Sequence, residues 1–107
     1  MITVCMATYN GEKYIEEQLE SVLMQLHSND EVIISDDGSG DSTVDLIRTF
    51  NDPRIRLLVG NNFFSPIQNF ENALKYAKGD YIFLCDQDDV WFPDKVESML
   101  QYLLQYD

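Results

Sequence analysis

Basic residues are scarce in this sequence. The chain of 107 residues has 7 Lys and Arg against 19 Asp and Glu, which gives a net charge of −12 at pH 7. Nucleic-acid binding depends on clustered Lys and Arg that neutralise phosphates, so this balance argues against nucleic acid as a partner. A ligand that carries phosphate would need something besides side chains to neutralise its charge, which suggests a metal ion.

Long apolar runs, paired cysteines and clustered histidines are also lacking. No run approaches the roughly 20 apolar residues of a membrane helix, and no basic segment followed by a cleavable apolar one opens the chain. We therefore expect a cytoplasmic protein. Cys5 and Cys85 lie in apolar runs without CxxC spacing, which favours buried free thiols over a disulfide or a zinc site. The lone His27 follows an apolar helical stripe, where a helix-end cation is favoured over a catalytic imidazole.

Short apolar runs alternate with helical stripes along the whole chain, with no linker between them. The predicted strands are Ile2–Ala7, Val32–Ile34, Ile55–Val59 and Tyr81–Cys85. The predicted helices carry apolar faces at Ile15, Leu19, Val22, Leu23 and Leu26; at Val44, Ile47 and Phe50; at Ile67, Phe70, Ala73, Leu74 and Ala77; and at Val96, Met99, Leu100 and Leu103. Strands that are apolar on both faces and alternate with helices predict a single α/β domain, residues 1–107, built on a covered parallel sheet.

The ends of the predicted helices have recognisable residues. Asp41 or Ser42 is placed to cap the second helix at its N-terminus. Gly79 stands where a glycine ends the third helix, and Pro93 opens the last one.

Polar clusters follow three of the four predicted strands. They are residues Thr8–Gly11, Asp36–Asp41 and Asp86–Asp89. Right-handed crossovers bring the carboxyl ends of parallel strands to one edge of the sheet, and ligands bind there at a point where the strand order reverses. The sequence therefore predicts one functional site built from these three clusters.

The cluster after the fourth strand places three carboxylates, Asp86, Asp88 and Asp89, within four residues. Carboxylates this close repel one another unless a cation or a bound ligand lies among them. Hard divalent metals prefer carboxylate oxygens, so the pattern favours a metal site over an exposed acidic loop.

Four stretches of the chain also follow the order and spacing of a known family. They are VCMATYNGEKYIEEQLESVLMQ, IISDDGSGDST, QNFENALKYAKGDYIFL and CDQDDVWFPDKVE. With these motifs the sequence resembles the N-terminal, donor-binding half of a family 2 glycosyltransferase, which has the Rossmann-like GT-A fold of nucleotide-diphospho-sugar transferases. The last stretch is similar to members that build bacterial surface polysaccharides, including rhamnosyltransferases.

The resemblance implies a role for each motif. Thr8, Tyr9 and Asn10, with Glu12 close by, match the segment that packs around the nucleotide base. Asp37, or its neighbour Asp36, matches the carboxylate that accepts a hydrogen bond from a base such as uracil or thymine. Asn69 lies at a helix start, where helix capping and a donor contact are both open.

The DxD motif is the last of these. Asp86 would face the ribose or the metal's water, and Asp88 would bind a divalent metal, Mn²⁺ or Mg²⁺, with Asp89 behind it. Trp91 would border the sugar pocket or belong to the core. The implied reaction is inverting transfer from a UDP- or dTDP-type sugar to a glycan or lipid-linked acceptor, at the inner face of the membrane in a full-length enzyme.

Two features depart from the family pattern. The loop before Asn69 reads Asn61, Asn62, Phe63, Phe64, Ser65, Pro66, where the family usually has a glycine. The family's second half, which supplies the acceptor site and the general base, has no counterpart here. We therefore expect a fragment of a longer enzyme that is inactive by itself and whose apolar last helix favours self-association.

Two other interpretations of the acidic run remain. Asp86 to Val90 also matches the DxDx(T/V) pattern of haloacid dehalogenase-like phosphohydrolases, with Asp86 as nucleophile and Asp88 as general acid. That pattern normally opens its domain, whereas three strand-helix units precede it here. A non-catalytic metal- or nucleotide-binding module, such as a receiver-like switch, would use Asp36 and Asp37, but no lysine follows a later strand at the expected place.

Overall fold

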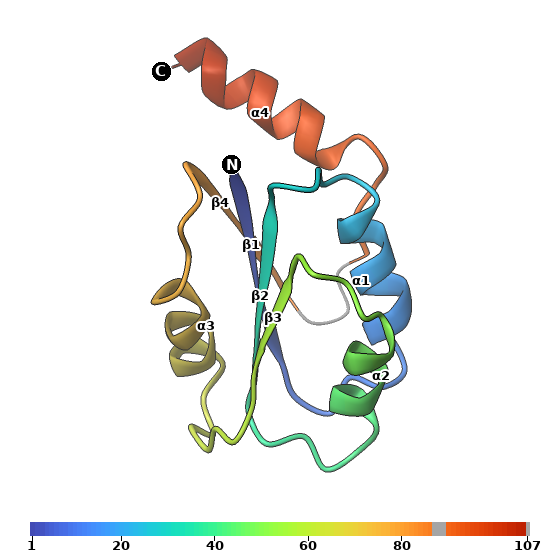
Figure 1. Cartoon of the computed structure of the whole chain (residues 1–107). Helices are drawn as coiled ribbons and strands as arrows, with labels where there is room; N and C mark the ends of the chain where they lie inside the picture. Colours follow the sequence, from blue (N-terminus) through green and yellow to red (C-terminus); the bar gives the residue numbers. More distant parts are fainter. Residues whose placement is uncertain (87–89, 107) are drawn as a thin grey trace.

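A computed structural model describes residues 1–86 and 90–106 of the chain, and in these residues strands and helices alternate (Figure 1). In chain order they are β1 (Ile2–Thr8), α1 (Ile15–Leu23), β2 (Glu31–Asp36), α2 (Thr43–Thr49), β3 (Ile55–Leu58), α3 (Pro66–Leu74), β4 (Tyr81–Cys85) and α4 (Lys95–Tyr106). The predicted α/β alternation is confirmed, and the strand boundaries lie within two residues of the predicted ones.

The strands form one parallel sheet in the order β3-β2-β1-β4. The chain therefore steps outward from β1 to β2 and β3, and then returns to the other side of β1 to form β4. Strand order reverses between β1 and β4, and in open α/β sheets this is where a ligand-binding crevice forms at the carboxyl ends of the strands.

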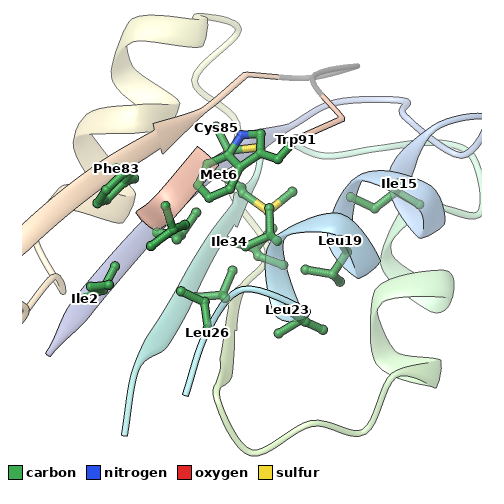
Figure 2. Close-up of a cluster of buried hydrophobic side chains, with 14 of the residues drawn as sticks. Ile2, Met6, Ile15, Leu19, Leu23, Leu26, Ile34, Phe83, Cys85 and Trp91 are labelled. Carbon is green, nitrogen blue, oxygen red and sulfur yellow. The ribbon is translucent and has the colours of Figure 1, made fainter. Parts of the chain in front are cut away.

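Helices cover both faces of the sheet (Figure 1): α1 and α2 lie on one face and α3 on the other. The main core lies under α1, whose predicted stripe is buried as expected. Figure 2 shows Leu19 and Leu23 pointing toward Met6 and Ile34 of the sheet. No helix among the described residues has the length and apolar content that crossing a membrane requires.

Helix α3 buries only part of the predicted face, which includes Ala73, and turns its asparagine side toward the sheet. Ile67 is 72% exposed and Leu74 is 39% exposed, whereas Asn69 and Ala73 are buried. The reason is that α3 lies over polar groups of the sheet. The Asn69 amide donates to the Thr8 carbonyl at 3.2 Å, and the Asn72 amide donates to Ser35 Oγ at 2.9 Å. These two hydrogen bonds turn the asparagine side of α3 toward the sheet, because the amide groups find acceptors there.

Strand β4 is not covered on both faces as predicted. Phe83 and Cys85 are buried, but Ile82 is 46% exposed and Leu84 is 54% exposed. The cause is that α3 packs against β1 and β2, whereas β4 lies at the edge of the sheet, next to β1 alone among the described strands. This apolar surface supports the expectation that the chain self-associates, which stays a prediction.

Both cysteines are buried free thiols, as predicted. Burial, with a smaller effect of Glu31, raises the pKa of the Cys5 thiol to about 11.

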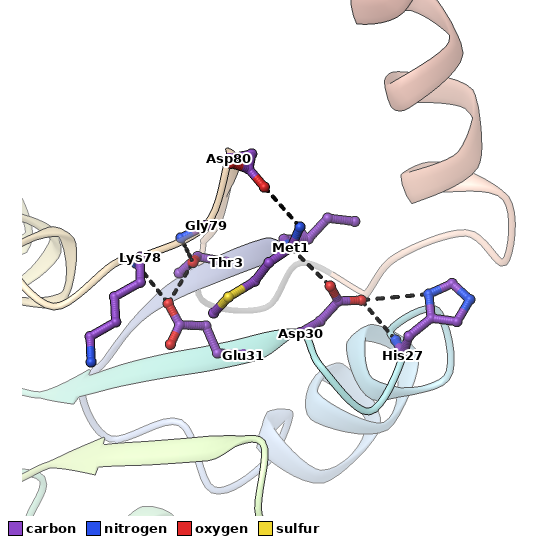
Figure 3. Close-up of polar contacts among 9 residues, drawn as sticks. Met1, Thr3, His27, Asp30, Glu31, Lys78, Gly79 and Asp80 are labelled. Atoms are coloured by element: carbon purple, nitrogen blue, oxygen red, sulfur yellow. Dashed lines mark hydrogen bonds and ion pairs between the residues drawn. The ribbon is translucent and has the colours of Figure 1, made fainter.

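The prediction that His27 is a cation at the end of a helix was wrong, because α1 ends at Leu23. His27 lies in the following turn, where its ring Nδ1 is 3.6 Å from Asp30 Oδ2 (Figure 3).

The prediction that Gly79 ends a helix was also wrong, because Lys75 is the C-cap of α3. Gly79 instead lies against β1, where a Cβ atom would be 2.6 Å from both the backbone nitrogen and Oγ1 of Thr3. The Gly79 amide donates to Thr3 Oγ1 at 2.8 Å, and that hydroxyl donates to Glu31 at 2.6 Å (Figure 3). The glycine allows close approach of two backbones.

Replacing Gly79 by alanine is expected to destabilise the fold by about 1–3 kcal/mol, because the new methyl group overlaps β1 backbone that cannot move independently of the sheet. Urea unfolding followed by circular dichroism measures the change. Gly40→Ala is the matched control, since no atom lies within 4 Å of a Cβ built there. Equal losses of stability in the two variants would contradict the close-approach explanation.

Candidate functional site

A cavity of about 360 Å³ opens at the carboxyl ends of β1 and β4, at the reversal of strand order. Five of the predicted site residues line it together: Thr8, Tyr9, Asp37, Asn69 and Asp86. The remaining lining residues are Ala7, Phe64, Ser65, Pro66 and Phe70. Residues up to 79 positions apart in the sequence therefore meet at one place, as the parallel topology predicted.

Asp37 is buried against this cavity, with 7% of its surface exposed. Its Oδ1 accepts from the Phe63 amide at 2.6 Å, and its Oδ2 accepts from the Ser65 amide at 3.2 Å. Its own amide donates to the Thr8 carbonyl at 3.0 Å. Asp37 thus joins the end of β1 to the loop that precedes α3.

Asn69 brings an amide group to the wall of the cavity from the first turn of α3. Its Nδ2 donates to the Thr8 carbonyl, but among the described residues its buried Oδ1 has no hydrogen-bond partner. A buried acceptor left unpaired costs roughly 1–3 kcal/mol, so a donor group on a ligand would be favoured here.

Asp36 does not line the cavity, although it is adjacent to Asp37. Its Oδ1 accepts from Thr8 Oγ1 at 2.7 Å and from Ser39 Oγ at 2.6 Å, and its Oδ2 accepts from the Ser39 amide at 2.9 Å. Successive residues of a strand point to opposite sides, which separates the two carboxylates. Asp36 holds the turn after β2 in place.

Asn10 and Glu12 also lie outside the cavity lining and bind the loop after β2. The Asn10 backbone N–H donates to Ser39 Oγ at 2.9 Å, and the Asn10 side-chain Oδ1 accepts from the Gly40 backbone amide at 2.8 Å. Glu12 Oε2 accepts from the Ser42 amide at 3.1 Å. These contacts fasten the loops after β1 and β2 to each other.

Asp41 completes this contact between the loops. Its Oδ1 accepts from the Thr43 amide at 3.0 Å, so Asp41 supplies the hydrogen bond at the start of α2, while Ser42 is the N-cap residue without a side-chain bond. Burial acts to raise the pKa of Asp41, but hydrogen bonds from Thr43 and from the Glu12 amide hold this pKa below its ordinary value. The carboxylate form maintains the loop geometry.

The acidic run is described only at its first residue. Asp86 is exposed and lines the cavity, whereas Asp88 and Asp89 lie outside the described residues. Among residues 1–86 and 90–106, no group of three or more His, Cys, Asp or Glu side chains is placed to hold a metal ion. Two residues of the cavity wall, Asp86 and Asn69, carry oxygen atoms that could ligate a metal: the Asp86 carboxylate and the unpaired Asn69 Oδ1. Hard divalent cations prefer such oxygen ligands.

A row of polar residues, Gln18 and Ser21 on α1 and Gln25 in the turn that follows it, supports this end of the site and was missed by the sequence reasoning. Gln18 is buried, and its amide donates to the Asp86 carbonyl. Ser21 Oγ accepts from the Trp91 amide at 3.0 Å, and the Gln25 amide donates to the Phe92 carbonyl at 2.7 Å. The spacing i, i+3, i+7 beside the apolar stripe was a usable signal, because such residues share one helix face.

Trp91 belongs to the core and does not line the cavity. It is 4% exposed, and its ring centroid lies 5.9 Å from that of Phe83. The Lys95 ammonium lies 4.6 Å from the centre of the Trp91 ring, a cation–π distance. Of the two roles open to Trp91, the structure supports the core role.

Comparison with known proteins identifies the family. The sequence pattern of "Glycosyl transferase family 2" matches residues 3–107 of the chain. The chain belongs to glycosyl transferase family 2. The GT-A fold expected for this family is confirmed by the solved structures that it resembles.

Several curated glycosyltransferases are similar in sequence. The Escherichia coli enzyme "UDP-Glc:alpha-D-GlcNAc-diphosphoundecaprenol beta-1,3-glucosyltransferase WfgD" is 34% identical over 105 residues, which are 98% of this chain and 42% of that protein. The Shigella flexneri "dTDP-rhamnosyl transferase RfbG" is 38% identical over 106 residues, 92% of this chain and 37% of that protein. The chain spans about two fifths of the length of these relatives.

Two solved structures share its fold. S. aureus TarS 1–349 in complex with UDP has a TM-score of 0.86 and 28% identity, over 97% of this chain and 32% of that one. The mannosyltransferase PcManGT from Pyrobaculum calidifontis, in complex with GDP-Man and Mn²⁺, has a TM-score of 0.86 and 27% identity, over 95% of this chain and 32% of that one.

Proposed function

We propose that this chain is the donor-binding half of an inverting glycosyltransferase. The whole enzyme would move a sugar from a nucleoside-diphosphate sugar to a glycan or lipid-linked acceptor during surface polysaccharide synthesis. One observation carries the proposal. Thr8, Tyr9, Asp37, Asn69 and Asp86 line the same cavity, which lies at the reversal of strand order. The family resemblance predicts that these five residues belong to one donor site.

The base of the nucleotide is assigned to the part of the cavity near Asp37. A carboxylate has about four acceptor positions, and loop amides use two of those on Asp37. A further one remains for the ring N–H of uracil or thymine, whereas cytosine presents an acceptor nitrogen that the carboxylate repels. This difference supports a UDP- or dTDP-type donor over a cytidine nucleotide.

The diphosphate is assigned to the side of the cavity where Asp86 lies, with Asp86 and Asp88 as the proposed ligands of Mn²⁺ or Mg²⁺. Carboxylate and amide oxygens at the cavity are the ligands that such a cation prefers. When bound, the metal would act as a Lewis acid that stabilises the departing nucleoside diphosphate. The PcManGT complex, which contains GDP-Man and Mn²⁺, supports this assignment by analogy.

Transfer itself is assigned to sequence beyond these 107 residues. No residue of this chain is assigned as the general base, and the relatives are more than twice its length. We propose a single domain over residues 1–107 that works on the cytoplasmic side of the membrane. Its exposed apolar residues on β4, Ile82 and Leu84, would be covered in the longer protein.

Calorimetry with UDP, dTDP, CDP and GDP in the presence of Mn²⁺ tests the proposal. We expect UDP or dTDP to bind at least about 10-fold more tightly than CDP, because a buried unpaired polar group costs roughly 1–3 kcal/mol. Absence of binding by every nucleotide, or hydrolysis of a phosphate monoester that depends on Asp86, would contradict it. The second outcome would favour the phosphohydrolase alternative.

A further inference from the structure

Phe64 has an uncommon backbone conformation in the loop between β3 and α3. Its φ angle is +54°, in the left-handed region that residues other than glycine rarely adopt, because Cβ approaches the following carbonyl oxygen. This is the loop where the family usually has a glycine. The phenyl side chain is 81% exposed and lines the cavity. Neither the strain nor the exposed ring stabilises the fold, so the arrangement points to a ligand.

The loop holds Phe64 in this position from both sides. The Phe63 and Ser65 amides donate to the two oxygens of Asp37. The Asn61 side-chain Nδ2 donates to the backbone carbonyls of Asp36 and Leu58 at 3.0 and 3.1 Å. Ser65 then caps α3, with Pro66 at its first position. The backbone position of Phe64, from which the ring projects, is therefore determined by the same carboxylate that is assigned to the base.

A second exposed aromatic ring lines the same cavity from another loop. Tyr9, directly after β1, is 51% exposed. Apart from Asp37, Asn69 and Asp86, the cavity wall is largely apolar or aromatic. A flat aromatic ring is the kind of ligand group that gains most from such side chains, because stacking uses the whole face of each ring.

We propose that Phe64 is a stacking platform for the nucleobase of the donor and thus a determinant of donor affinity. This inference rests on the proposed function, because it presumes a nucleoside diphosphate in the cavity. Phe64 and Asp37 would then have different roles in binding the nucleotide. Phe64 would contribute to the binding of every base, since each has a π face, whereas Asp37 would decide which base is preferred.

Phe64→Asn is the most informative variant, since asparagine tolerates a positive φ and the change replaces the ring with a small carboxamide that offers no aromatic face. We expect UDP, dTDP and CDP to bind roughly 5- to 100-fold more weakly in Mn²⁺, by a similar factor for each base. Inorganic pyrophosphate with Mn²⁺ should bind as before. Phe64→Tyr should retain the affinity for UDP.

Ile67→Ala is the matched control, because Ile67 is also apolar and highly exposed, at 72%, but does not line the cavity. It should leave UDP binding unchanged. Urea unfolding should show Phe64→Asn to be at least as stable as the parent, which excludes misfolding as the cause of weaker binding.

Three outcomes would overturn the inference while the proposed function stands. They are equal UDP affinity in Phe64→Asn and the parent, an equal loss of pyrophosphate binding, and a parent that binds UDP no more tightly than pyrophosphate. If the parent binds no nucleoside diphosphate at all, the proposed function itself fails.

Discussion

Removing divalent metal is expected to weaken nucleoside diphosphate binding by at least about 100-fold, or roughly 2.7 kcal/mol. The physical reason is charge. The protein has a net charge of −12, and the described cavity lining contains two aspartates and no Lys or Arg. A diphosphate brought to this wall is repelled unless a cation lies between them. Titration calorimetry with UDP in Mn²⁺ and in EDTA measures the difference.

Asp88→Asn should reproduce most of the effect of EDTA when Mn²⁺ is present, and Asp86→Asn should have a similar or smaller effect. Asp94→Asn is the control, because it removes the same charge from an exposed position that does not line the cavity. Equal UDP affinity in EDTA and in Mn²⁺ would rule out the metal-dependent site.

Asp37→Ala is expected to lower both stability and base selectivity. Loss of the carboxylate leaves the Phe63 and Ser65 amides without their acceptor, which we expect to cost about 2 kcal/mol of folding free energy. The loop that carries Phe64 would then lose its fixed position, and UDP binding should weaken more than 10-fold. The preference for UDP over CDP should disappear as well. Urea unfolding and calorimetry measure the two effects separately.

Asp37→Asn serves as the matched variant for this prediction. It retains one acceptor oxygen and the side-chain volume, so it should recover part of the stability, but its uncharged amide should not restore the full preference for UDP. Phe64→Asn should show the opposite pattern, with weaker binding and an unchanged preference. If Asp37→Ala keeps the parent's preference for UDP over CDP, the assignment of Asp37 to the base is wrong.

Much of the architecture was predictable from the sequence, because short-range patterns determine it. The apolar stripe from Ile15 to Val22 defines a helix, and the run Val32–Ile34 defines a buried strand, without reference to any distant residue. Alternation of such elements leaves a parallel sheet as the compact solution. The meeting of Thr8, Asp37 and Asp86 at one edge follows from that topology, so most of the cavity's polar lining was predicted.

The errors arose where distant backbones approach each other. Gly79 was expected to end a helix, but its role depends on Thr3, which lies 76 positions earlier in the sequence. The buried face of α3 depends on acceptors at Thr8 and Ser35, which outweigh the apolar character of Ile67. No local pattern contains these partners.

The sequence by itself determined the order of strands and helices, the parallel sheet and the acidic and polar strand ends, since each depends on neighbours within a few residues. Only the tertiary structure decided that Asp37 reaches the cavity while Asp36 supports the turn beneath it. It also decided that Asp37, by accepting hydrogen bonds from the backbone amides on either side of Phe64, fixes the backbone from which that cavity-lining residue projects. These choices depend on hydrogen bonds across 26 to 28 positions of sequence, which exist only once the loops are folded against the sheet.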